Sequence, residues 1–73
     1  MKDDALWSDT ADGMLAEASY LSESHEYEVT VTMGSSKLSK RFPAAYEPRF
    51  GIDVDDMQQI CEIAEELSKS LEG

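Results

Sequence analysis

Residues 27–33 read Tyr-Glu-Val-Thr-Val-Thr-Met, so apolar and polar side chains alternate along the stretch. This alternation, with many β-branched residues, is typical of a strand with one buried face. A Gly-Ser-Ser turn signal follows it. Beyond the turn, Leu38 and Phe42 share one face of a second strand. The sequence therefore predicts a β-hairpin with strands over 26–33 and 37–42.

The C-terminal segment predicts an α-helix over about 54–71. Asp53 can cap its N-terminus, and Asp55 and Asp56 lie where the helix dipole favours negative charge. Apolar residues recur at steps of three and four, which places them on one side of the helix. They are Met57, Ile60, Cys61, Ala64, Leu67 and Leu71. Because Cys61 lies in this stripe, we expect a buried thiol and not a nucleophile.

The N-terminal segment predicts a second helix over about 5–20. Its apolar residues have helical spacing: Trp7, Ala11, Met14, Ala18 and Leu21. Gly13 lies inside this pattern and costs a helix about 1 kcal/mol relative to alanine. Residues 19–24 have an alternative interpretation as a strand that precedes the hairpin.

Residues 43–52 are predicted to form an ordered loop in which Tyr46 and Phe50 pack inward. The expected fold class is therefore α+β, a small single domain over residues 1–73 with a helix–β-hairpin–helix order. A two-stranded antiparallel ribbon is marginal in water, so both helices are expected to cover it. An exposed ribbon edge would allow a homodimer or pairing with a partner strand.

The chain is short and strongly acidic, since its 73 residues carry 16 acids and 6 bases for a formal net charge of −10. A chain of this length buries only about 60% of its unfolded surface, which leaves no room for separate cofactor and substrate domains. Its negative charge disfavours direct binding to nucleic acid or to anionic membranes.

The bases gather in the middle of the chain, between two acidic ends. Residues 29–52 hold Lys37, Lys40, Arg41 and Arg49 against a single acid. We expect these bases to pair with acids of the helices or to solubilise the ribbon. Lys40 interrupts the apolar face of its strand, which is typical of an edge strand.

The expected compartment is intracellular and cytoplasmic. A single cysteine excludes an intramolecular disulfide, which small secreted domains usually need. The first residues, Met-Lys-Asp-Asp, do not resemble a signal peptide, and no apolar stretch approaches the roughly 20 residues of a membrane span. The initial methionine indicates a complete small gene product.

Catalytic and metal-binding residues are sparse. His25 is the only histidine and Cys61 the only cysteine, and zinc sites with one histidine and no thiol are uncommon. Asp53, Asp55 and Asp56 begin like a calcium loop, but the glycine and closing glutamate of the EF-hand spacing are missing. We therefore expect no enzymatic activity, no metal and no cofactor.

The density of carboxylates is the strongest functional signal. Helical side chains three or four positions apart are separated by roughly 5–6 Å, a spacing similar to that of neighbouring phosphates. An acidic helix can thus occupy a basic groove that normally binds DNA or RNA. Nucleic-acid-mimicking inhibitors use this logic, and that functional class includes small phage proteins that act against restriction or CRISPR systems.

Two functional hypotheses follow. The first is a small acidic, non-enzymatic inhibitor that blocks a basic nucleic-acid-handling protein by charge mimicry. Its predicted contacts are Asp12, Asp55, Glu62, Glu65 and Glu66. The alternative is an accessory interaction subunit that binds or dimerises through its ribbon and aromatic loop. Its predicted contacts are Tyr27, Val29, Phe42, Tyr46 and Phe50.

Overall fold

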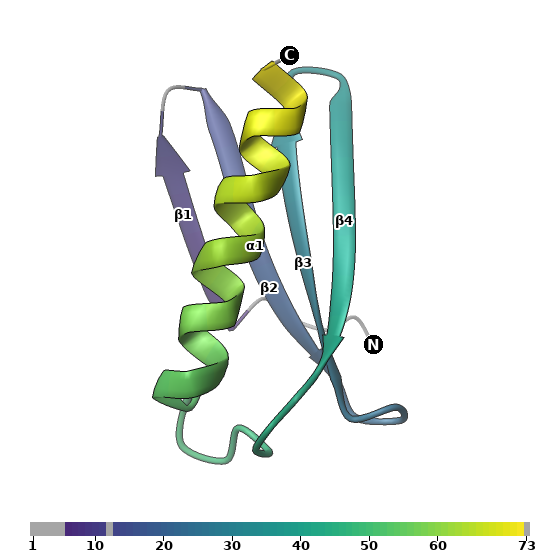
Figure 1. Cartoon of the computed structure of the whole chain (residues 1–73), viewed down its shortest axis with the longest axis vertical. Coiled ribbons are helices and arrows are strands. Elements are labelled where there is room, and N and C mark those ends of the chain that lie inside the picture. The colour runs from purple at the N-terminus through teal and green to yellow at the C-terminus, as the bar shows by residue number, and fades with distance from the viewer. Residues whose placement is uncertain (1–5, 12, 73) are drawn as a thin grey trace.

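The computed structural model describes residues 6–11 and 13–72 and shows one sheet packed against one helix. The elements are β1 (Trp7–Ala11), β2 (Met14–Leu21), β3 (Glu26–Met33), β4 (Ser36–Pro43) and α1 (Val54–Glu72). The four strands are antiparallel and lie in the order β1-β2-β3-β4. The helix crosses one face of the sheet (Figure 1). Within the described residues, no helix is long and apolar enough to cross a membrane.

The expected helix–β-hairpin–helix fold is wrong. Residues 7–11 and 14–21 form β1 and β2 in place of the helix predicted over 5–20, so a four-stranded sheet replaces the two-stranded ribbon. Residues 5 and 12 of the predicted helix lie outside the described part of the chain. The fold of the described residues is α+β in the order β-β-β-β-α, with one helix packed on one face of the sheet.

Two features of the N-terminal segment explain why it forms strands. Gly13 has a φ of +80°, which side-chain-bearing residues rarely adopt. Ala11 is paired with Met14, so only an Asp-Gly pair connects β1 to β2, and Asp-Gly is a strong signal for a two-residue hairpin turn. Within β2, apolar side chains also recur at every second position. They are Met14, Ala16, Ala18 and Tyr20.

The hairpin predicted over 26–33 and 37–42 is observed as β3 and β4. Met33 lies opposite Ser36, so Gly34 is the first of two turn residues. Its φ of +61° matches the positive φ that a type II′ turn requires at this position. β4 is an edge strand, as the position of Lys40 predicted.

The core lies between α1 and the middle of the sheet. Its members are Ala18, Tyr27, Val29, Val31, Ile60, Ile63, Ala64 and Leu67. The buried stripe of the helix therefore includes Ile63, whereas Cys61 is exposed, and the buried thiol that we expected is wrong. Each residue turns a helix by about 100°, so a side chain next to Ile60 points well away from the core axis.

The loop that precedes α1 is tied to the first turn of the helix by Asp56. This carboxylate is only 2% exposed and accepts hydrogen bonds from the N–H of Ala45 at 2.9 and 3.2 Å and of Tyr46 at 3.1 Å. The cap predicted at Asp53 is confirmed, because its Oδ2 accepts from the N–H of Asp55 at 3.0 Å. Asp56 thus fixes where α1 starts relative to the end of β4.

The inward packing expected of the loop aromatics is wrong. Tyr46 is 56% exposed and Phe50 is fully exposed. Ala44 and Ile52 pack against the core instead. The hydrogen bonds from the N–H groups of residues 45 and 46 to Asp56 fix the backbone of this part of the loop.

Tyr27 carries a buried hydroxyl group near the start of β3. Its ring stacks on Phe42, with centroids 5.5 Å apart, and meets the edge of Tyr20 at 5.3 Å. The hydroxyl has no hydrogen-bond partner among the described residues. Burial, and after it the negative charge of Asp56, raises the pKa of Tyr27 to about 12.

We predict that Asp56→Ala lowers the free energy of unfolding by about 2–3 kcal/mol, because the N–H groups of Ala45 and Tyr46 lose their buried acceptor. Asp55→Ala is the matched control, since it removes the same charge from the same turn at an exposed position. Chemical denaturation measures both variants. Equal losses for the two would show that Asp56 acts only through the helix dipole.

We predict that Tyr27→Phe raises the free energy of unfolding by about 1 kcal/mol, because it removes a buried hydroxyl without a partner. The pKa of this tyrosine rises from 10.0 to about 12 on folding, so the folded state retains a proton that the unfolded state loses. The wild type should therefore lose roughly 2 kcal/mol more than Tyr27→Phe as the pH rises through this interval. Parallel pH profiles would contradict the prediction.

Candidate functional site

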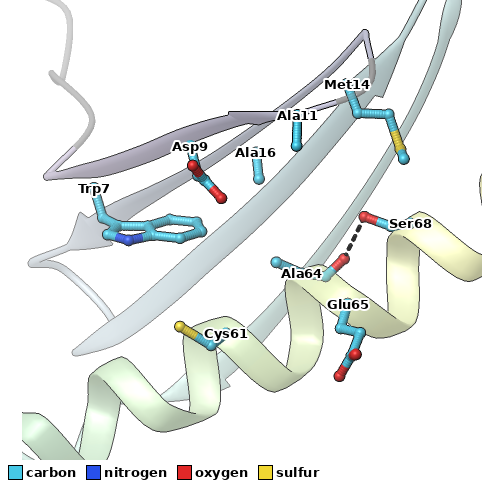
Figure 2. Close-up of a pocket in the computed structure, with 9 residues that line it drawn as sticks. All are labelled: Trp7, Asp9, Ala11, Met14, Ala16, Cys61, Ala64, Glu65 and Ser68. Carbon is cyan, nitrogen blue, oxygen red and sulfur yellow. Dashed lines mark hydrogen bonds between the residues drawn. The ribbon is translucent and has the colours of Figure 1, made fainter.

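The helix covers only part of the sheet. Within the described residues, the backbone of α1 lies close to β2, β3 and β4 but not to β1, whose Trp7 side chain packs against the core. A groove of about 400 Å³ remains between β1 and the helix, and we call it the β1 groove (Figure 2). Its lining residues are Trp7, Asp9, Ala11, Met14, Ala16, Cys61, Ala64, Glu65 and Ser68.

The walls of the β1 groove are mostly apolar, with one acid pointing into it. Trp7 lies along the sheet wall and the Asp9 carboxylate points into the groove (Figure 2). On the helix wall the Cys61 thiol is turned toward the sheet, whereas Glu65 extends outward to solvent. The Ser68 hydroxyl donates a hydrogen bond to the Ala64 carbonyl of the same helix at 2.8 Å, so its proton is not free to bind a ligand in the groove.

A second groove lies on the other side of the helix, along β4, and we call it the β4 groove. Its volume is about 450 Å³. It is lined by Lys40, Phe42, Gln59, Glu62, Ile63 and Glu66. The Lys40 ammonium contacts the Glu66 carboxylate at 3.4 Å across this groove. The helix is therefore flanked by one groove along each edge of the sheet.

The acids predicted to bind a partner lie along α1, not in one compact cluster. Asp55, Glu62, Glu65 and Glu66 are all exposed. Glu65 borders the β1 groove, whereas Glu62 and Glu66 border the β4 groove. These four acids are called the helix acids below. Asp12, the remaining predicted contact, lies outside the described residues.

Three of the four bases in the middle of the chain form ion pairs. Besides Lys40 with Glu66, Arg41 contacts Glu28 at 3.5 Å and Arg49 contacts Glu47 at 3.4 Å. The expected pairing with a helix acid is confirmed for Lys40 alone, because Arg41 pairs with an acid of β3 and Arg49 with an acid of its own loop. All three pairs are exposed, so each contributes at most about 1 kcal/mol to stability.

The residues of the alternative hypothesis divide between the core and the loop. Tyr27 and Val29 are fully buried, and Phe42 is half-buried against Tyr27. Tyr46 and Phe50 are exposed on the loop before α1. Only the loop aromatics therefore offer a partner most of their surface in this fold.

The described residues contain no group of three or more His, Cys, Asp or Glu side chains placed to hold a metal ion. His25 lies in the turn between β2 and β3 with a φ of 56°. Its Nδ1 is 3.0 Å from the Tyr20 hydroxyl. His25 thus pairs with an aromatic residue of the neighbouring strand.

Comparison with known proteins gives no match: no protein-family model, curated protein or solved structure resembles this chain significantly. The β1 groove was not predicted, because a helix was expected where its sheet wall lies. The Asp-Gly pair at 12–13 and the alternation in residues 14–20 were the signals that could have revealed that wall.

We predict that Cys61 reacts with iodoacetamide in the folded protein at a rate within about threefold of that in denaturant, because its side chain is exposed at the groove. Mass spectrometry of the alkylated chain gives both rates. If the thiol reacts only after unfolding, Cys61 lies in the core. The buried face of α1 would then differ from the observed one by a rotation of about one residue.

Proposed function

We propose that the protein is a small acidic, non-enzymatic binding protein that inhibits a basic nucleic-acid-handling protein by charge mimicry. The observation that supports this proposal most directly is the row of exposed helix acids on the layer that covers the sheet. The proposal places the protein in the class of small phage proteins that act against restriction or CRISPR systems.

The distribution of charge supports this choice of surface. The face of the sheet opposite the helix mixes signs, with Glu17 and Glu28 on the same face as Lys37 and Arg41. The helix, by contrast, holds six acids and one lysine, and all of these acids except the buried Asp56 are exposed. The electric field of the protein would thus steer a basic partner toward the helix layer. The association rate would be higher at low ionic strength.

The spacing of the helix acids supports mimicry of a phosphate backbone. Glu62 and Glu66 lie one helical turn apart, and Glu65 stands beside them on the side of the β1 groove. Carboxylates at these positions are separated by roughly the interval between successive phosphates of a strand. Arginine and lysine side chains that bind phosphates recognise carboxylates by the same charge-assisted hydrogen bonds.

One observation favours the alternative of an accessory interaction subunit. Phe50 is fully exposed beside the half-exposed Tyr46, in a loop that Asp56 holds in place. Aromatic side chains on an ordered loop often anchor protein–protein contacts. In this case the contacts would be apolar and largely insensitive to salt.

We predict that the double substitution Glu62→Lys and Glu65→Lys weakens binding of the captured partner by about tenfold or more at about 50 mM salt. The partner is first captured from native lysate on the immobilised wild type and identified by mass spectrometry. Its affinity is then measured at about 50 and about 500 mM salt. Duplex DNA or RNA should compete with the protein for this partner.

The matched control is Glu17→Lys with Glu23→Lys, which makes the same charge change away from the helix. This control should retain most of the affinity. If the helix variant binds like the wild type while Phe50→Ser abolishes the complex, the interaction subunit is the correct function. Affinity that does not change with salt would also contradict charge mimicry.

A further inference from the structure

The two edge strands of the sheet carry opposite charges on the side that faces the helix. Among the described residues, β1 and β4 each have a neighbouring strand on one side only. Trp7, Asp9 and Ala11 occupy the helix side of β1, and Asp9 is its only charged residue there. On the same side of β4 the only charged residue is Lys40, whose exposed ammonium contacts Glu66 of the helix at 3.4 Å in the single copy.

We propose that the protein self-associates head to tail, with β1 of one copy pairing antiparallel with β4 of the next. Because neighbouring strands alternate in direction, β1 and β4 of two copies in the same orientation run antiparallel. Such pairing continues the sheet without a break and keeps all helices on one face. It also satisfies the backbone groups that an edge strand leaves unpaired.

One register of the two strands pairs opposite charges and also brings apolar side chains into contact. Side chains alternate between the two faces of a strand, so residues of the helix side can only meet residues of the helix side. If Asp9 lies opposite Lys40 of the next copy, antiparallel pairing places Trp7 opposite Phe42. The same register places Ala11 opposite Leu38. Cross-strand pairs of opposite charge and of aromatic residues both stabilise sheets.

The two grooves give this register room for its side chains. The β1 groove and the β4 groove flank the helix with volumes of about 400 and 450 Å³. Trp7, Leu38 and Phe42 are each only half-buried in the single copy. In the paired edge each of them is covered by the neighbouring copy, so surface that one chain leaves exposed becomes buried.

Charge disfavours the two symmetric pairings that would compete. Pairing of two β1 strands would bring Asp9 of one chain close to Asp9 of the other. Pairing of two β4 strands would bring together the basic residues Lys37, Lys40 and Arg41 of both chains. The net charge of −10 opposes any self-association. At about 0.15 M salt, however, charges further apart than about 8 Å are largely screened, whereas a contacting Asp9–Lys40 pair is not.

A head-to-tail contact of this kind either closes into a ring or continues as a filament. In both cases the helix acids recur along one face of the assembly. This self-association differs from the proposed inhibition, because it uses the sheet edges and not the exposed side of the helix. The two surfaces meet only where Lys40 contacts the helix acid Glu66 in the single copy. Each of the two can therefore fail without the other.

The test is a charge swap followed by sedimentation velocity at about 0.15 M salt over a range of protein concentrations. The wild type should exceed the monomer mass of 8.1 kDa as its concentration rises. Asp9→Lys alone and Lys40→Asp alone should each weaken association by about tenfold or more. The double variant should recover to within about threefold of the wild type.

Mixing the two single variants is the decisive arm. In the mixture, the lysine at position 9 of the Asp9→Lys chain faces the aspartate at position 40 of the Lys40→Asp chain. Asp9 of the Lys40→Asp chain likewise faces Lys40 of the Asp9→Lys chain. Both kinds of contact join opposite charges, so the mixture should associate more strongly than either variant alone. Circular dichroism establishes that each variant is folded. The only tryptophan, Trp7, should shift its emission to shorter wavelength on association, because Phe42 of the next copy covers it.

Three results would overturn the proposal. The first is a wild type that stays monomeric at every concentration. The second is association that Lys40→Asp leaves unchanged, which would indicate pairing of two β1 strands. The third is a mixture of the single variants that associates no better than either variant alone.

Discussion

A single helix covers a sheet that is wider than the helix, and the rest of the surface follows from where that helix lies. The buried Asp56 carboxylate binds the backbone of Ala45 and Tyr46, and so it sets the start of α1 close to the end of β4. From there the helix packs along β3, with contacts to β4 and β2. Because helix diameters are about 10 Å and strands lie about 4.8 Å apart, one helix covers about two strands. The sheet wall beside β1 is thereby left open.

This placement separates the charges of the molecule. The helix acids lie on the outer side of the covering layer, while most bases of β4 and the following loop are held in ion pairs. The edges differ as well, since the helix side of β1 carries Asp9 and that of β4 carries Lys40, which contacts Glu66 in the single copy. The position of the helix on the sheet thus supports two separate proposals. In the first, the helix layer binds a basic partner; in the second, the sheet edges bind a second copy of the chain. Neither surface requires a pocket for a small ligand.

The local parts of the fold could be predicted from the sequence, and its long-range part could not. The β3–β4 hairpin and the C-terminal helix each follow from a periodicity confined to their own residues. In residues 7–21, however, Trp7, Ala11, Met14 and Ala18 fit a helical spacing, while the apolar residues of β2 also fit a period of two. Pairing of β2 with β3 favours the strand over the helix. Because β3 lies outside the segment, the periodicity of residues 7–21 alone does not reveal this pairing. Cys61 was misplaced because one helical step separates it from the buried Ile60.

Amide hydrogen exchange, measured residue by residue, reports most directly on the sheet and its uneven cover. If the helix lies over β3 and leaves most of β1 uncovered, the slowest exchange falls at Val29 and Val31. In the monomer, residues 7–11 should then exchange much faster, with chemical shifts typical of a strand. Helical shifts in residues 7–20, or protection of β1 equal to that of β3 at a concentration where the chain is monomeric, would contradict this arrangement.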